Sequence, residues 1–333
     1  MDAGKSKMSR ALGLRAGDWV EVRSAAEILA TLDERGRLDA LPFMPEMLQY
    51  CGKRFRVFKS AHKTCDTIES YQNRKLTDSV HLEELRCGGE AHGGCQAGCL
   101  LFWKEAWLKR APGPEARDGS QRVAGGTAAP QSGFQVLIDA ARVPAVKGEE
   151  GEERYSCQAT EMLRATTPLH WWDPRQYLKD LASRNVRLRD VLWYGAIAVF
   201  NMVIRRLNWR VRRYPYMPGP VAGKTPTELL DLQAGELVQV RGKREIMRTI
   251  NFNRQNRGLS FDVEMAPYCG KTFRVLRRVE RIVDEKTGRM LQIRGDCLIL
   301  SGVTCGGCLS RNRLFCPRAI YPYWREIWLK RVE

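Results

Sequence analysis

Cysteine is the residue type in this 333-residue chain with the most obvious chemical potential, and ten of the eleven cysteines fall into two groups. A histidine, His92, lies inside the first group in the phrase CGGEAHGGCQAGC. Structural zinc is held by four thiolate or imidazole ligands, and glycines let the backbone curl tightly around the ion. The sequence therefore predicts two structural zinc ions, with ligands drawn from Cys51, Cys65, Cys87, His92, Cys95 and Cys99 in the first group and from Cys269, Cys297, Cys305, Cys308 and Cys316 in the second.

An internal duplication relates the two groups. Residues 17–57 align without a gap to 235–275, and WKEAWLKR at 103–110 matches WREIWLKR at 324–331. Such register over about forty residues is typical of a repeated structural unit. The alignment pairs Cys51 with Cys269, Cys87 with Cys305 and Cys95 with Cys316. The fourth ligand stays open, because position 65 corresponds to Val283 and position 99 to Ile320; the candidates are Cys65, His92 or Cys99 in the first copy and Cys297 or Cys308 in the second.

Other uses of these cysteines are compatible with the spacing. Four thiolates also hold iron–sulfur clusters, although the chain lacks the tight C-x2-C-x2-C run of ferredoxins. A buried cysteine can serve simply as a small apolar side chain. A catalytic metal keeps one coordination position open, and the neighbourhood of His92 and Cys99 is where such a site is expected.

The elements that must position these residues are mostly short strands. Apolar residues alternate in the segments around Val20, Val57 and Leu82, and a Pro-bounded loop with one short helical turn separates the first two segments. The predicted fold class is α+β, with two small SH3-like β-barrel modules that carry zinc-ribbon-like cysteine clusters and are joined by a helical segment. The predicted boundaries are 14–110 for the first module, 111–154 for a linker, 155–230 for the helical segment and 231–333 for the second module.

The middle of the chain changes from period two to helical periodicity. Asp173-Pro174 predicts a helix start, and a second helix is expected from about Arg187 to Leu207. The apolar residues 134–138 predict a strand, and GEEGEER at 148–154 an acidic turn. Thr225-Pro226-Thr227-Glu228 predicts the capping box of a short helix.

The net charge of +17 arises from 55 Lys and Arg against 38 Asp and Glu, which favours an acidic partner such as nucleic acid or a peptide. The apolar run 191–204 is too short to cross a bilayer, yet arginines, Trp209 and Tyr214 follow it. Peripheral membrane contact through 191–213 is therefore an alternative. The N-terminus has no uninterrupted apolar core of a secretory signal, so a cytoplasmic location is expected.

Two further sets of residues recur in both copies. Trp103 and Trp107 match Trp324 and Trp328, and they lie beside basic residues. Such tryptophans either stack on a nucleic acid or peptide or fill the module cores. Glu46, Lys53 and Arg56 recur as Glu264, Lys271 and Arg274, which predicts matching salt bridges inside each module.

The phrases LPFMPEMLQYCGKRFRV, HGGCQAGCLLFWKEAWLKR and SRNRLFCPRAIYPYWREIWLKR resemble a bacterial cysteine-rich family with a duplicated module. The resemblance brings no activity and no catalytic residue. No Ser-His-Asp order, paired carboxylates or nucleotide fingerprint emerges from the chain. The functional hypothesis is a zinc-stabilised tandem-repeat binding or accessory protein for an acidic macromolecule. The alternative is a metal-dependent enzyme that acts on a peptide or small metabolite in a biosynthetic pathway.

Overall fold

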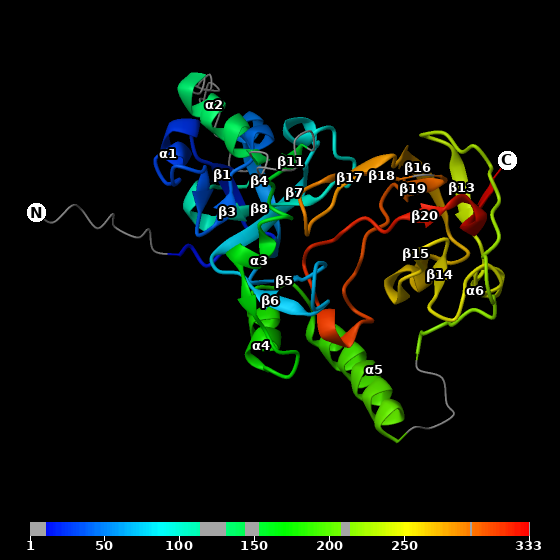
Figure 1. Ribbon diagram of the computed structural model, residues 1–333. Helices are drawn as coiled ribbons and strands as arrows, with labels where there is room; N and C mark the ends of the chain where they lie inside the picture. Colours follow the sequence, from blue (N-terminus) through cyan, green and yellow to red (C-terminus); the bar gives the residue numbers. More distant parts are fainter. Residues whose placement is uncertain (1–10, 114–130, 144–152, 208–213, 294, 333) are drawn as a thin grey trace, which may run out of the picture.

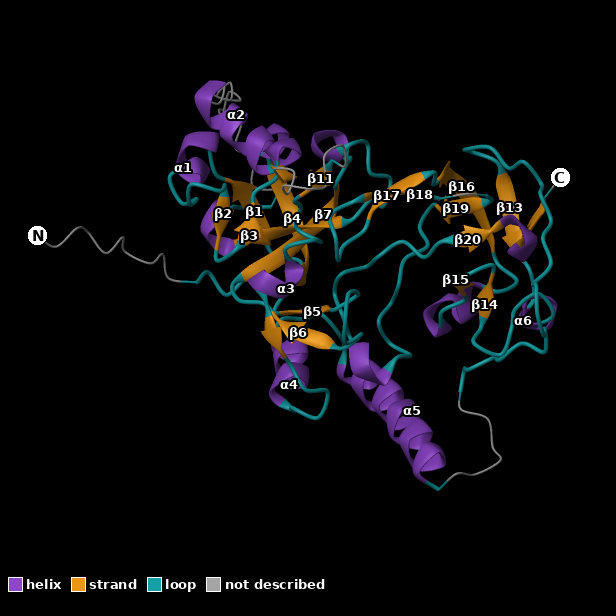
Figure 2. Cartoon of the chain, viewed as in Figure 1, coloured by secondary structure: helices purple, strands orange, loops and turns teal. Residues whose placement is uncertain are grey.

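The structure is a computed structural model that describes residues 11–113, 131–143, 153–207, 214–293 and 295–332 (Figure 1). Helices and strands are mixed, and the sheets are partly curled into half-barrels (Figure 2). This confirms the α+β class.

The first module is built on a five-stranded antiparallel sheet with strand order β8-β7-β4-β1-β9. Its strands are β1 (Trp19–Val22), β4 (Arg54–Ser60), β7 (Ser79–Arg86), β8 (Leu100–Lys104) and β9 (Leu108–Arg110). The alternation that predicted β1, β4 and β7 points Val20, Val57 and Leu82 into the core, where all three are fully buried. The short helix α1 (Ala25–Leu29) is capped by Ser24.

The second module has a sheet of the same connectivity, in the order β20-β19-β16-β13-β21. Its strands are β13 (Leu237–Val240), β16 (Thr272–Arg278), β19 (Cys297–Leu300), β20 (Trp324–Arg325) and β21 (Leu329–Arg331). Val20 pairs with Phe55 in the first sheet, and Val238 pairs with Phe273 in the second. The strand registers therefore agree residue for residue along the duplicated sequence.

The segment between the first two long strands is more regular than a Pro-bounded loop. In the first module it forms the hairpin β2 (Arg37–Leu38) and β3 (Leu41–Pro42) and the 3₁₀ helix η1 (Pro45–Tyr50). The second module has α6 (Lys243–Met247), β14 (Gln255–Asn256), β15 (Leu259–Ser260) and η5 (Val263–Tyr268) in the same order. The 3₁₀ helices matter here because each carries a glutamate.

Buried aromatic residues organise both cores. The ring of Phe43 meets that of Trp107 edge-on at 5.1 Å, and Phe261 meets Trp328 at 5.3 Å. The indole nitrogens of Trp107 and Trp328 each donate to a threonine hydroxyl. All four repeated tryptophans are fully buried, so they fill the cores, and the nucleic-acid stacking interpretation is wrong for them. The 3₁₀ helices that carry two of them are η3 (Glu105–Trp107) and η7 (Glu326–Trp328).

Small hairpins bring the two modules into contact. They consist of β5 (Lys63–Cys65) and β6 (Asn73–Lys75), extended by β12 (Thr167–Pro168), and of β17 (Arg281–Val283) and β18 (Met290–Gln292). The Cys65 N–H donates to Cys316 Sγ at 3.1 Å, and the Val283 N–H donates to Cys95 Sγ at 3.3 Å. Because the repeat pairs 65 with 283 and 95 with 316, these two contacts between modules are equivalent.

The connecting segment contains α2 (Gln131–Ala140), β10 (Arg142–Val143), β11 (Arg154–Tyr155), α3 (Met162–Ala165), α4 (Arg175–Ala182) and α5 (Leu188–Arg206). Helices α4 and α5 confirm the two predicted helices. In Figure 1, α5 points away from both sheets. Within the described part of the chain, no helix has both the length and the apolar character needed to span a bilayer.

Two local predictions in this segment are wrong. Residues 134–138 are helical, as part of α2, because so short an apolar stretch satisfies either period and Leu137 packs into the first module's core. Thr225 caps no helix; its hydroxyl accepts the Arg257 N–H at 2.8 Å, and Glu228 pairs with Arg241 at 2.8 Å. Residues 114–130 of the predicted linker and most of the acidic turn at 148–154 lie outside the described residues.

Candidate metal centre

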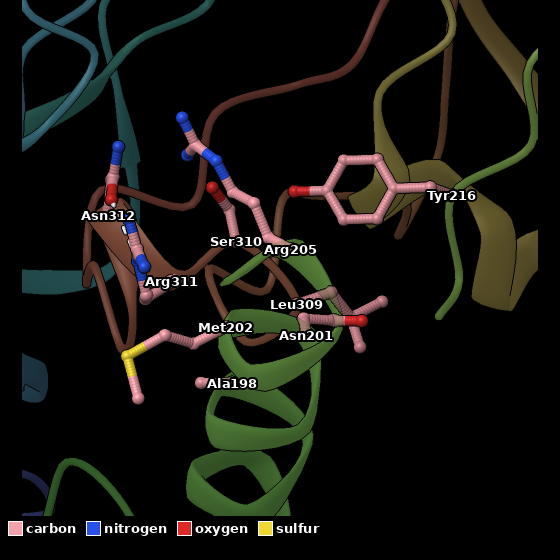
Figure 3. Close-up of a pocket in the computed structure, with 9 residues that line it drawn as sticks. All are labelled: Ala198, Asn201, Met202, Arg205, Tyr216, Leu309, Ser310, Arg311 and Asn312. Carbon is pink, nitrogen blue, oxygen red and sulfur yellow. Dashed lines mark hydrogen bonds between the residues drawn. The ribbon is translucent and has the colours of Figure 1, made fainter. Parts of the chain in front are cut away.

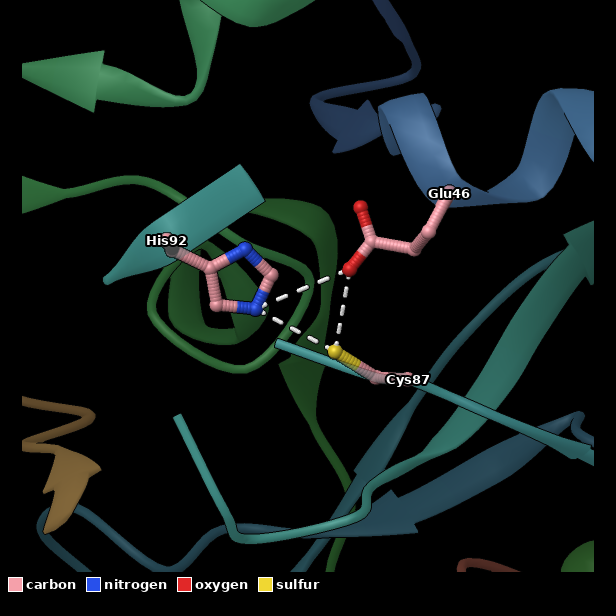
Figure 4. A group of neighbouring side chains, drawn as sticks. All are labelled: Glu46, Cys87 and His92. Carbon is pink, nitrogen blue, oxygen red and sulfur yellow. Dashed lines mark hydrogen bonds and ion pairs between the residues drawn. The ribbon is translucent and has the colours of Figure 1, made fainter. Parts of the chain in front are cut away.

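Three elements of the first module bring one side chain each to a common point (Figure 4). Glu46 comes from η1, Cys87 follows β7, and His92 ends the short 3₁₀ helix η2 (Glu90–His92). The loop between them turns sharply at Gly89, which has a φ of 82°. A Cβ there would lie 2.0 Å from the Cys95 carbonyl oxygen, so only glycine fits this turn.

The three donor atoms lie within hydrogen-bond or ion-pair distance of one another. Cys87 Sγ is 3.2 Å from Glu46 Oε1 and 3.2 Å from His92 Nε2, and His92 Nε2 is 3.8 Å from Glu46 Oε1. Among the described residues, this is the one group of three or more His, Cys, Asp or Glu donors close enough to share a metal ion.

The trio is largely buried, and its polar atoms are incompletely satisfied. The side chains of His92 and Glu46 are 2% and 5% exposed. His92 Nδ1 and Glu46 Oε2 have no hydrogen-bond partner among the described residues. Burial and the neighbouring Glu46 carboxylate raise the pKa of the Cys87 thiol, and burial lowers the pKa of His92. A buried carboxylate without a cation is costly, so the arrangement suits a positive ion at its centre.

The geometry favours metal binding over nucleophilic catalysis. In a Cys–His–acid triad, the carboxylate accepts from the imidazole nitrogen that faces away from the thiol. Here Glu46 Oε1 approaches the same nitrogen, Nε2, that faces Cys87, whereas Nδ1 is unpartnered. A catalytic thiol also needs a depressed pKa, and that of Cys87 is raised. One sulfur, one nitrogen and one oxygen donor form a set that suits Zn²⁺.

A small cavity of about 40 Å³ adjoins the trio and has room for a few water molecules. Its walls include Cys95, Cys99 and Cys157 from the first half and Glu285 and Arg318 from the second. Burial raises the pKa of Cys99 to about 12 and that of Cys157 to about 11, so both present neutral thiols there. Cys157, which lies outside the repeat, is thus a neighbour of the candidate site.

The equivalent acid of the second module has other partners. Glu264 accepts the backbone N–H groups of Cys308 at 3.1 Å, Leu309 at 2.6 Å and Ser310 at 3.0 Å. Burial raises the pKa of Glu264. Burial and the neighbouring Glu264 carboxylate both raise the pKa of Cys305. Burial raises the pKa of Cys308 to about 11.

The other predicted ligands occupy separate places. Cys51 and Cys269 are half-buried against the two module cores, and Cys297 is buried in β19. Cys65 and Cys316 meet between the modules. All eleven thiols are free of disulfides. The structure therefore brings Cys87 and His92 together as predicted ligands, and the prediction of a second zinc site stays a prediction.

Glu46 is the site residue that the sequence did not identify as a ligand. Its recurrence as Glu264, together with the recurring basic residues, predicts salt bridges instead. In the structure, Arg56 lies 3.6 Å from Glu83, and Glu46 faces Cys87 and His92 instead. The sequence feature that could have indicated Glu46 as a ligand is that a glutamate precedes the cysteine group in both copies.

A second, basic recess lies between α5 and the 3₁₀ helix η6 (Arg311–Arg313) (Figure 3). It has a volume of about 100 Å³. Arg311 stacks on Trp171 at 4.4 Å and donates to Asn312 Oδ1 at 3.4 Å. Neither Arg205 nor Arg311 forms an ion pair within the described residues. The recess therefore offers two uncompensated positive charges beside the polar groups of Ser310, Asn312 and Tyr216.

Comparison with known protein families, with curated proteins and with solved structures finds no match for this chain.

Proposed function

We propose that the protein is a zinc-dependent binding or accessory protein for an acidic macromolecule. One observation carries the metal part: Glu46, Cys87 and His92 converge in a buried place where two of their polar atoms have no other partner. A zinc ion would satisfy the carboxylate and permit the thiol to ionise. Bound there, it would tie η1 to the glycine-rich loop that follows β7.

The proposal includes a finer architecture. Each half is a small SH3-like barrel, and the loop from Cys87 to Cys99 acts as a zinc-ribbon-like cap. The modules span 14–110 and 231–333, joined by 111–154 and 155–230. The duplicated strand order supports this division. A cytoplasmic location would keep the thiols reduced and available as ligands.

Metal analysis of protein purified under reducing conditions tests the zinc assignment. The described geometry supports one zinc per chain, bound at the trio. Two zinc ions per chain would support the sequence-based prediction of a second site as well. A chain without zinc that also takes up none from solution, or a chain with an iron chromophore, would contradict the proposal.

The basic recess supports the acidic partner. Phosphates or carboxylates would bind Arg205 and Arg311, and binding should weaken steeply with salt. We expect the double change Arg205→Glu and Arg311→Glu to reduce binding of a single-stranded oligonucleotide or a poly-glutamate peptide by more than about tenfold at low salt. The double change Lys243→Glu and Arg244→Glu, on α6 of the second module, alters the net charge by the same amount and is the matched control. Equal losses in the two variants would show that net charge, rather than the recess, governs binding.

A metal-dependent enzyme is the second candidate, because three protein ligands beside a cavity leave a coordination position for water or a substrate. Cobalt substitution separates the two functions. The spectrum of a cobalt ion with an open position changes when azide is added, whereas four protein ligands leave it unchanged. An unchanged spectrum would remove the enzymatic candidate and retain the structural role.

A further inference from the structure

The outer face of α5 is apolar along the whole length of the helix. Trp193 is 66% exposed, Phe200 48% and Leu192 66%. We define the α5 stripe as the exposed apolar side chains on this face, which are Leu188, Leu192, Trp193, Val199, Phe200, Val203 and Leu207. At 100° per residue, they fall on one side of the helix, opposite the face that lines the basic recess. A row of exposed apolar side chains along one face of a helix indicates a binding surface.

The apolar surface continues beyond the helix. A groove of about 320 Å³ beside α5 is lined by Val199, Tyr177 and Phe315, with Trp172 at its edge. The Trp172 side chain is 62% exposed and stacks on His170 at 4.3 Å. Tryptophan at the border of an apolar surface is typical of side chains that lie at a membrane–water boundary.

Basic side chains flank the stripe. Arg187 and Arg189 lie at the start of α5, and Arg206 lies at its end. Asp190 is the one acidic residue of the helix, and it pairs with Arg189 at 3.6 Å. The charge bordering the stripe is therefore positive, and an occupant must be both apolar and anionic.

The shape of the surface selects among such occupants. A partner peptide helix usually lies in a concave groove, but the groove beside α5 is lined by Val199 alone of the stripe residues, and the stripe lies on a helix that projects from the body (Figure 1). The 19-residue helix is about 28 Å long, so its stripe can lie flat on a plane over its whole length. We propose that α5 docks in the plane of an anionic lipid surface, with the stripe inserted among the acyl chains and the flanking arginines at the head groups.

Vesicle flotation of the full chain tests this proposal. We expect the protein to float with vesicles of phosphatidylcholine and phosphatidylserine at 3:1 and to bind pure phosphatidylcholine several-fold less. The double change Trp193→Ser and Phe200→Ser should lower partition by at least about tenfold. Arg206→Glu should lower it by about fivefold or more on anionic vesicles alone. Phe252→Ser, which changes an 80% exposed phenylalanine of the second module, is the matched control.

All the substituted side chains are exposed, so the variants should melt at the same temperature as the parent protein. A loss of vesicle binding can therefore be distinguished from unfolding. Slower amide exchange in 188–207 upon vesicle addition would support docking by α5. No flotation at low salt, or equal loss with Phe252→Ser, would overturn the proposal. A concentration-dependent dimer that is abolished by Trp193→Ser and Phe200→Ser, without flotation, would assign the stripe to a second copy and overturn it as well. None of these readouts depends on zinc or on the basic recess.

Discussion

The two modules place the same acid at the same point and use it differently. Glu46 in the first module faces a thiol and an imidazole, and one of its oxygens has no partner. Glu264 in the second module is saturated by three backbone N–H groups of the loop from Cys308 to Ser310. The comparison teaches that a duplicated framework can keep a buried carboxylate in both copies while, among the described residues, only the first copy brings three possible metal ligands together.

Loop length accounts for the difference. Seven residues separate Cys87 from Cys95, whereas ten separate Cys305 from Cys316. The longer loop folds back so that its backbone reaches Glu264, and Ser310 stands where the repeat would place His92. Backbone donors satisfy a buried carboxylate without any ion, so the second module is expected to hold its loop without metal.

The largest expected effect is a loss of stability, and it tests a feature that the two modules share, the buried tryptophan in each core. Trp107 and Trp328 each donate to a threonine hydroxyl, at 3.1 and 3.0 Å, and both are fully buried. Replacing either by alanine should cost about 3–5 kcal/mol because a large cavity remains. Urea denaturation followed by circular dichroism measures this loss. A cost below about 1 kcal/mol for one tryptophan would break the likeness of the two cores.

The next effect tests where the modules differ. Cys87→Ser should weaken zinc binding by more than about a hundredfold, since it removes a direct ligand. Cys305→Ser, at the equivalent position, should leave the affinity within about threefold. Competition with a chromogenic chelator measures both. Equal losses would show that both modules hold metal and would restore the prediction of two sites.

The two glutamates provide a smaller and more specific test. Without zinc, Glu264→Gln should cost about 1–3 kcal/mol, because the amide N–H₂ group would oppose a backbone N–H. Glu46→Gln should change the stability of the zinc-free protein by less than about 1 kcal/mol, since the carboxylate is poorly satisfied. With zinc added, only Glu46→Gln should lose ligand-induced stabilisation. Thermal melting with and without zinc decides between these outcomes, and the reverse pattern would contradict the assignment.

The sequence predicts features that arise from neighbouring residues better than features that depend on contacts between distant residues. Strands β1, β4 and β7 and helix α5 follow from local periodicity. The predicted strand at 134–138 is wrong because five residues are too few to distinguish a strand from a helix. The predicted capping box at Thr225 is wrong because the Thr225 hydroxyl accepts a hydrogen bond from a residue 32 positions away. Glu46 was not predicted as a metal ligand because its contact with Cys87 spans 41 positions in the chain and arises only when η1 packs on the loop.

The smallest expected effect concerns a turn near the contact between modules. Burial opposes ionisation of Asp66, but hydrogen bonds from Ser70, Glu69 and Ile68 outweigh it and lower its pKa to about 2. A depressed pKa in the folded state adds stability that is present above pH 4 and is lost as the pH falls from 4 to 2. Asp66→Asn should therefore cost about 1–2 kcal/mol at pH 6 and less at pH 3, by urea denaturation.

Asp284 is the equivalent residue of the second module and serves as the control. It receives the Lys286 N–H at 3.2 Å and the Thr287 hydroxyl at 2.6 Å. With fewer donors, Asp284→Asn should cost less than Asp66→Asn at pH 6. A larger cost for Asp284→Asn would reverse this part of the comparison.

The paired sulfur contacts between the modules have a consequence for the origin of the chain. Each module contributes one backbone donor and one sulfur acceptor, so the surface is self-complementary in the manner of an isologous dimer. A solitary ancestral module would have carried both halves of the joint, with residue 65 of one copy meeting Cys95 of its twin. Fusion of two such genes would then have allowed one loop to lengthen while the other kept Glu46, Cys87 and His92 together.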